Sequence, residues 1–154
     1  MNPAIAALAL SGILNGLTST ILGLFVFLRN PKKETNWSFG LFCLSVALWS
    51  YSYFFWQTSQ SYSQALFWSR ILMIPVIFTP VFYVHHILSL FGPKKYKKPT
   101  LLFGYIFGLI FSVMSITPYF VVSVGPKLSF PHWPNPGLAY HLFLPVWFSF
   151  VVWG

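Results

Sequence analysis

Residues 65–91 form an apolar run that constrains the fold more than any other part of the sequence. The run contains no acidic residue, and it is longer than the roughly 20 residues that a helix needs to cross the hydrocarbon core of a bilayer. A lysine-rich segment at 92–98 follows directly, as is typical of a helix end at the membrane surface. This stretch predicts a membrane-spanning helix that stops at a basic segment.

The composition excludes a soluble core. The chain has 154 residues, is 56% hydrophobic and 6% charged, and has a mean hydropathy of +0.70, whereas soluble domains carry about a quarter charged residues. The net charge of +8 is also found in nucleic-acid-binding proteins, but here the cations lie in short segments between apolar runs. We therefore expect the lipid bilayer, and no nucleic acid, as a partner. The single cysteine, Cys43, lies inside an apolar run and is expected to pack there.

The whole chain reads as an all-α, polytopic transmembrane helix bundle. Proline residues predict kinks in the third span at Pro75 and Pro80, and four prolines predict a stiff, irregular outer loop over 123–137. The fifth apolar run is shorter than a full span, so we expect the chain to be a fragment that holds four complete spans and most of a fifth, out of a longer protein. The predicted spans are about 3–28, 37–56, 65–91, 100–122 and 138–154.

The distribution of cations predicts an extracellular amino terminus in a multi-pass protein of the plasma membrane. Cytoplasmic loops of membrane proteins collect lysine and arginine. The predicted loops on the opposite side contain one such cation, Lys127. The predicted cytoplasmic loops, 29–36 and 92–99, contain Arg29, Lys32, Lys33, Lys94, Lys95, Lys97 and Lys98.

Small residues at helical spacing predict close helix contacts. Gly12 and Gly16 in the first span, and Gly104 and Gly108 in the fourth, let neighbouring backbones approach closely. Beside the first pair runs a polar stripe that would be unfavourable facing lipid, so we expect it to face protein. This stripe contains Ser11, Asn15, Thr18 and Ser19.

The sequence predicts no catalysis, no cofactor and no metal site. Glu34 is the single carboxylate and the chain has no aspartate, so it contains no paired carboxylates, no Ser-His-Asp triad and no carboxylate magnesium site. The adjacent His85 and His86 point about 100° apart on a helix and cannot hold one ion together. We expect both at the membrane interface, with one of them bonded inside the bundle.

Arg70 is the main ligand-binding candidate, because an ionisable residue inside a membrane span is by default a functional-site candidate. It lies roughly 7–8 Å inside the outer end of the third span. Its side chain can extend to outer-leaflet phosphates, or point inward to a backbone carbonyl, a hydroxyl of Tyr51 or Tyr53, a further helix or an anionic ligand. Among the inward partners we favour a ligand, since arginine pairs bidentately with carboxylates.

Three further residues are ligand-binding candidates for a small extracellular molecule. Asn15 lies on the polar stripe of the first span, and His132 and Trp133 lie in the proline-rich loop. The last two can line a ligand mouth as part of an aromatic cage. The alternative is an interfacial loop with a tryptophan anchor.

The order of several short motifs resembles the seven-helix amino-terminal sensor region of bacterial histidine kinases, which also precedes some diguanylate cyclases. The resemblance implies seven spans in the longer protein, a sensory input domain of a two-component system, a homodimer formed through the parent protein and a cytoplasmic output domain downstream. The motifs are Arg29-Asn30-Pro31, Asn36-Trp37-Ser38-Phe39, Ala47-Leu48-Trp49, Ala65-Leu66-Phe67-Trp68-Ser69-Arg70, His85-His86 and Pro136-Gly137-Leu138-Ala139-Tyr140.

Two other functions fit the sequence. A transporter or channel fragment would also place an arginine and proline kinks within its spans. A membrane scaffold would need no ligand and predicts no pocket among the first, third and fifth spans. An output domain in the downstream gene sequence would favour sensing, and a second set of spans would favour transport.

Overall fold

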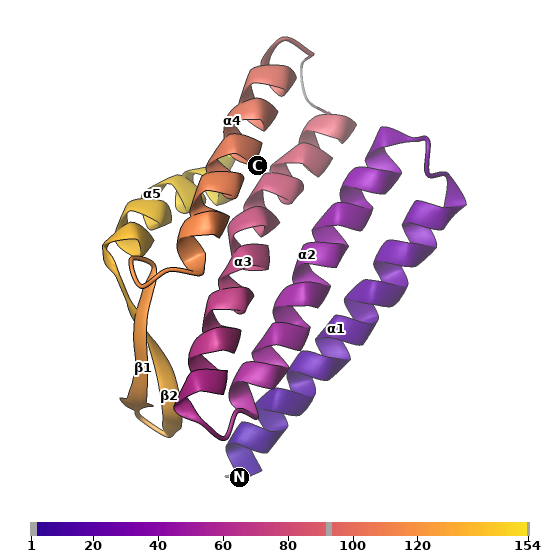
Figure 1. The fold of residues 1–154 in the computed structure, drawn as a ribbon. Coiled ribbons are helices and arrows are strands. Elements are labelled where there is room, and N and C mark those ends of the chain that lie inside the picture. Colours follow the sequence, from indigo (N-terminus) through magenta and orange to yellow (C-terminus); the bar gives the residue numbers. More distant parts are fainter. Residues whose placement is uncertain (1–2, 92–93, 154) are drawn as a thin grey trace.

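The structure, a computed structural model, describes residues 3–91 and 94–153 (Figure 1). Four of its helices are long and apolar enough to cross a membrane, and a shorter apolar helix follows at the carboxyl end. The prediction of an all-α transmembrane bundle is confirmed. The elements are α1 (Pro3–Arg29), α2 (Glu34–Gln57), α3 (Tyr62–Leu90), α4 (Lys94–Ser115), β1 (Val121–Lys127), β2 (Phe130–Pro136) and α5 (Leu138–Trp153).

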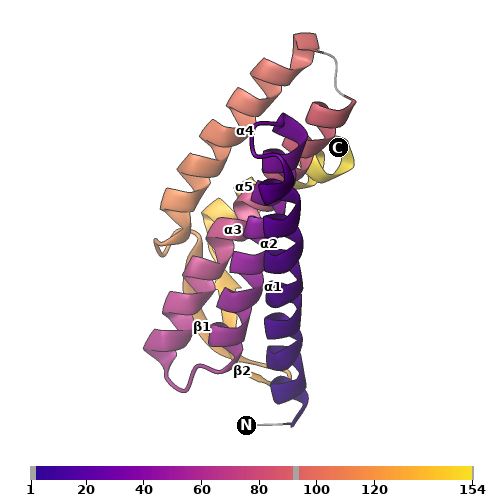
Figure 2. The ribbon, with the colours of Figure 1, turned by 90° about the vertical axis from the view of Figure 1, so that its right-hand side faces the viewer.

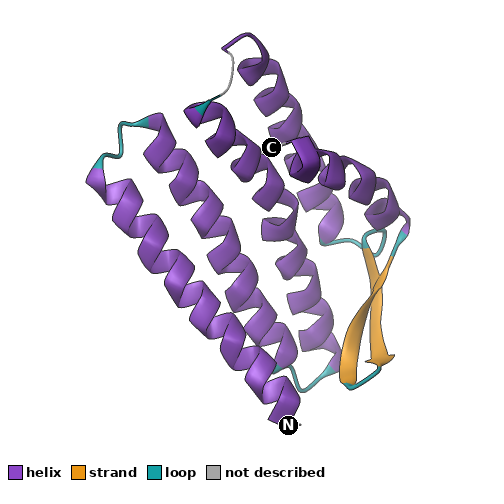
Figure 3. Cartoon of the chain, turned by 180° about the vertical axis from the view of Figure 1, so that it is seen from behind, coloured by secondary structure: helices purple, strands orange, loops and turns teal. Residues whose placement is uncertain are grey.

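Helices α1 to α4 lie side by side in one row, in chain order (Figure 1). α2 packs between α1 and α3, and α3 also contacts α4, α5 and both strands. In Figure 2, turned by 90°, α1 stands nearly upright, while α3 and α4 are both tilted relative to it. Seen from behind, α5 crosses α4 and ends near α3 (Figure 3). α3 is therefore the helix around which the other elements are arranged.

The two ends of the bundle differ in what they contain. We call the end with the start of α1, the α2–α3 turn and the two strands the hairpin end (Figure 1). The opposite end, with the α1–α2 turn and the start of α4, we call the lysine end. Between them, the largest apolar cluster joins α3, α4, α5 and the start of β1. It contains Ile77, Phe107, Phe120, Val121, Ala139 and Phe143.

The segment that we expected to be an irregular loop is an antiparallel β-hairpin, so that prediction was wrong. Val121 pairs with Pro136, and Lys127 with Phe130, with register shifts between these pairs. Proline removes a ladder donor, but it is tolerated on an edge strand. In a two-stranded ribbon each strand is an edge, and its prolines can face away from the partner.

The fourth helix is displaced toward the amino terminus relative to the predicted span of 100–122. It begins at Lys94, because lysine is a good helix former and the helix continues past the apolar run. It ends at Ser115, two residues before Thr117, which precedes a proline and is therefore disfavoured in the helical region. α2 likewise begins at Glu34, which we expected in a loop.

The four glycines predicted to pack lie against neighbouring helices. A Cβ added to Gly12 would lie 3.0 Å from the carbonyl oxygen of Ser50, and one on Gly16 would lie 2.6 Å from Cε1 of Tyr51. A Cβ on Gly104 would lie 3.0 Å from a ring carbon of Phe150. One on Gly108 would lie 2.5 Å from a ring carbon of Phe78 on α3. These positions have no room for a side chain unless the neighbour moves.

Helix α3 continues through both of its prolines. Pro80 has no N–H to donate to the carbonyl of Val76, four residues earlier. That carbonyl instead accepts a hydrogen bond from the indole Nε1 of Trp147 on α5, at 2.9 Å. A side chain of the last helix thus occupies the gap that the proline leaves in the third. The kinks at Pro75 and Pro80 stay a prediction.

Candidate functional site

Arg70 binds the backbone of the hairpin. It lies two turns into α3, partly buried, and its Nε and Nη2 donate to the carbonyl oxygen of Val121 at 3.3 and 3.0 Å. The inward partner of Arg70 is therefore a backbone carbonyl, one of the options that the sequence left open. The hydroxyl of Tyr51, another of those options, instead lies 3.0 Å from Oγ1 of Thr20. A role for Arg70 in binding an anionic ligand stays a prediction.

The hairpin is also attached to the end of α2. The indole Nε1 of Trp56 donates to the carbonyl oxygen of His132 at 2.9 Å. The Trp133 ring lies edge-on to that of Trp56, with 5.8 Å between centroids, and Lys127 Nζ lies 5.6 Å from the Trp133 centroid. His132 thus contributes its backbone, and Trp133 packs on other rings, so these contacts fix the hairpin to the helices.

Asn15 lies apart from these residues, at the exposed edge of the contact between α1 and α2. Its Nδ2 donates to Ser50 Oγ at 2.7 Å. One turn and a half further along, the hydroxyls of Thr20 and Tyr51 form a second cross-link between the same helices. The structure does not bring Asn15 together with Arg70, which faces β1 from α3.

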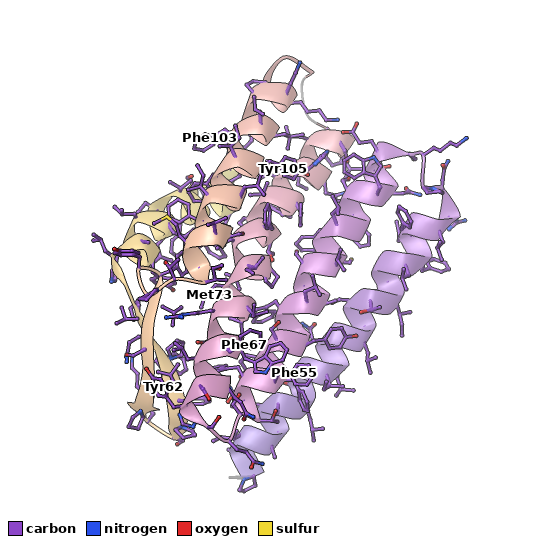
Figure 4. All side chains as sticks on the ribbon, in the orientation of Figure 1. Phe55, Tyr62, Phe67, Met73, Phe103 and Tyr105 are labelled. Carbon is purple, nitrogen blue, oxygen red and sulfur yellow. The ribbon has the colours of Figure 1, made fainter. Side chains whose placement is uncertain are left out.

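A charged network joins three helices at the lysine end. His85 on α3 is 4% exposed, and its Nδ1 lies 2.7 Å from the hydroxyl of Tyr105 on α4, whose side chain is labelled in Figure 4. Its Nε2 lies 3.2 Å from Glu34 Oε1, and Lys97 Nζ lies 2.6 Å from Glu34 Oε2. The one carboxylate of the chain therefore connects the starts of α2 and α4 to α3.

Both adjacent histidines are bonded, where the sequence predicted one. His86 Nδ1 lies 3.2 Å from Ser38 Oγ on α2, while His85 takes part in the network with Glu34. The side chains diverge to different partners, and no group of three metal-ligating side chains occurs within residues 3–91 and 94–153.

The network was missed in the sequence because Glu34 and Lys97 were both placed in loops. Both instead lie in first turns of helices, which fixes their direction. One signal was available: Glu34 is the only acid between basic residues, and it follows the first basic segment directly. The helix dipole favours an acid in the first turn, which supports a helix that starts there.

Comparison with known proteins gives one family. A family model described as the N-terminal 7TM region of histidine kinase matches residues 12–154. No curated protein and no solved structure gives a match.

Proposed function

The chain belongs to the family of N-terminal 7TM regions of histidine kinase, and on this premise we propose that it senses a signal at its hairpin end and passes it to a cytoplasmic output domain through α3. The family is a sensory, non-catalytic membrane region, and the resemblance seen in the sequence is confirmed. The stimulus, the direction of signalling and the output domain are the parts that we propose.

The observation that carries this proposal is that polar contacts hold α3 at both ends to different neighbours. Near one end Arg70 binds β1, and near the other His85 binds groups on α2 and α4. These two residues are separated by about 22 Å along a helix that rises about 1.5 Å per residue. A shift of the hairpin that moves α3 as a rigid element would therefore change the contacts of Glu34 and Tyr105.

Helix shifts at subunit interfaces in allosteric transitions are typically about 1–2 Å. The distance between His85 Nε2 and Glu34 Oε1 is already 3.2 Å, so a displacement of this size would break the contact. The charged network can accordingly have two discrete states, which is what a switch between an active and an inactive output requires.

The distribution of charge supports an orientation with the hairpin end outside. The lysine end contains Lys32, Lys33, Lys97 and Lys98, as cytoplasmic ends do. The hairpin end has Lys127, which is exposed at the end of β1. In this orientation the hairpin meets extracellular molecules and the Glu34 network lies near the cytoplasm.

The test is autophosphorylation by the full-length gene product in proteoliposomes. We expect Arg70→Gln and Glu34→Gln each to change basal autophosphorylation, because each releases one end of α3. Lys32→Gln is the matched control, since it removes one exposed charge at the lysine end and should leave activity unchanged. A gene that continues into further membrane spans, with no kinase or cyclase domain, would instead favour transport.

A further inference from the structure

A cavity of about 520 Å³ opens at the hairpin end, where three separate segments meet. Its walls come from Ile5 near the start of α1, from residues 57–60 at the end of α2 and the turn after it, and from residues 128–131 at the tip of the hairpin. Its volume lies in the range of about 300–1,000 Å³ that is typical of small-molecule sites. We call it the Gln57 pocket.

Gln57 is the unusual residue in its wall. It is 8% exposed, and its Nε2 is fully buried with no hydrogen-bond partner among the described residues. Buried side-chain donors are nearly always bonded in native proteins, so an unbonded one needs an explanation. The terminal torsion of a glutamine side chain is broad, and rotation about it can present the amide to the cavity.

The wall is uncharged. Hydroxyl and amide groups of Thr58, Ser59, Gln60 and Ser129 lie beside apolar surface from Ile5 and Phe130. An ion would find no opposite charge among these residues to offset its desolvation. The lining therefore fits a neutral molecule with an apolar body and one or two polar groups.

The tip of the hairpin adds a second feature at the same place. Leu128, which lines the pocket, has a φ of 53° and is 95% exposed. A leucine rarely adopts this left-handed conformation. Burial of its exposed apolar side chain against a ligand would be favourable in free energy. A ligand in the pocket would cover part of the Leu128 side chain.

We propose that the Gln57 pocket binds a small uncharged molecule that combines an apolar group with a hydrogen-bond-accepting oxygen, to which Gln57 donates. Its role as the stimulus rests on the proposed function. The same hairpin carries the Val121 carbonyl that binds Arg70, so an occupant at the hairpin tip contacts the element that holds α3.

The experiment measures protection of a single cysteine in the full chain in lipid nanodiscs. Ser129→Cys places a thiol in the pocket wall, and Ser123→Cys places one on the same hairpin, next to Asn135. The native Cys43 is buried. The probes are N-acetyl-leucinamide and N-acetyl-phenylalaninamide, which are uncharged, with zwitterionic leucine as the comparison.

We expect either amide to slow the maleimide reaction of Ser129→Cys at least threefold, to leave Ser123→Cys unchanged, and to act better than leucine. Gln57→Leu, added to Ser129→Cys, should raise the amide concentration needed for protection about threefold to tenfold, the effect of one hydrogen bond. No slowing by either amide, equal slowing at both cysteines, or full protection with Gln57→Leu would overturn the proposal.

The unfolding temperature of the Gln57→Leu variant shows whether it folds. We expect this temperature to be unchanged or raised, because leucine has a volume similar to that of glutamine and the substitution removes a buried donor that has no partner among the described residues. The labelling assay needs no output domain, so it separates the two proposals. If the amides give no protection but Arg70→Gln changes autophosphorylation, the pocket proposal alone is overturned. If the amides protect but neither Arg70→Gln nor Glu34→Gln changes autophosphorylation, the proposed signalling alone is overturned.

Discussion

Lys97 Nζ lies 2.6 Å from Glu34 Oε2, so the first turn of α4 is joined to the first turn of α2 across the end of α3. The pair is partly open to solvent, with 22% of the lysine side chain and 43% of the glutamate side chain exposed. Water therefore screens it, and its energy should be that of a surface pair.

A double-mutant cycle of Glu34→Gln and Lys97→Gln should give a coupling energy of about 0.2–1 kcal/mol in detergent at low salt. The coupling should shrink in 1 M salt, where screening acts over about 3 Å. The free energy of unfolding is the measured quantity. Lys98→Gln is the control, because Lys98 is exposed on the same helix. An equal coupling between Glu34 and Lys98 would contradict a specific pair.

Gly16→Leu and Gly108→Leu should each lower the free energy of unfolding by about 1–3 kcal/mol, the usual cost of overpacking. Each new side chain would meet an aromatic ring on the next helix, Tyr51 or Phe78. Thermal unfolding in detergent measures the loss. Ala7→Leu adds comparable bulk to an exposed position of α1 and should have no such effect. If both glycine variants are as stable as the parent, these faces contact lipid.

Arg70→Lys keeps the charge but loses the planar fork, and Arg70→Gln loses the charge. Both leave the Val121 carbonyl without its two donors. We expect each to lower the free energy of unfolding by about 1–3 kcal/mol and to alter the stimulus response of the full-length gene product. Arg29→Lys, at an exposed helix end, is the control. Unchanged stability and signalling in both variants would make Arg70 a lipid anchor.

A cysteine placed at Ser59 should react with a membrane-impermeant maleimide in intact cells, and one placed at Lys97 should not. The two positions lie at the hairpin end and the lysine end, and the lysines should stay inside. Labelling after cell lysis shows that each thiol is reactive. The reverse pattern would place the hairpin in the cytoplasm and exclude extracellular sensing.

Trp147→Phe should lower the free energy of unfolding by about 1–3 kcal/mol, because it leaves the partly buried carbonyl of Val76 without its donor. The measurement is chemical unfolding in detergent. Trp153→Phe, a change of the same kind at a residue that is 56% exposed, should cost much less. Similar losses in both variants would mean that ring volume, and not the hydrogen bond, is responsible.

Hydropathy was sufficient to predict the helices because lipid requires each spanning segment to be apolar and internally hydrogen-bonded. The predicted spans lie within three residues of the ends of α1, α2 and α3. Hydropathy does not indicate how far a helix continues beyond the membrane into water. Glu34 and Lys97 were therefore placed in loops, although each lies in the first turn of a helix. The charged network depends on those extra turns.

The hairpin and its contacts were beyond a sequence argument for a different reason. Prolines weigh against central strands, and they are tolerated on an edge strand, at the first residue of a strand or at a bulge. Whether a strand is an edge depends on how many strands pair. The bonds from Arg70 to Val121 and from Trp56 to His132 join residues that are 51 and 76 positions apart. No local spacing encodes such pairs.

The bond between Trp147 and Val76 has a consequence for biogenesis. Its two partners are 71 positions apart, so when α3 is inserted during synthesis the donor has not yet been made. The nascent third helix must remain in the bilayer with one unpaired carbonyl, shielded by water, lipid headgroups or the insertion machinery, until α5 arrives. Assembly of the bundle therefore has a built-in order, in which the last described helix completes the backbone of the third.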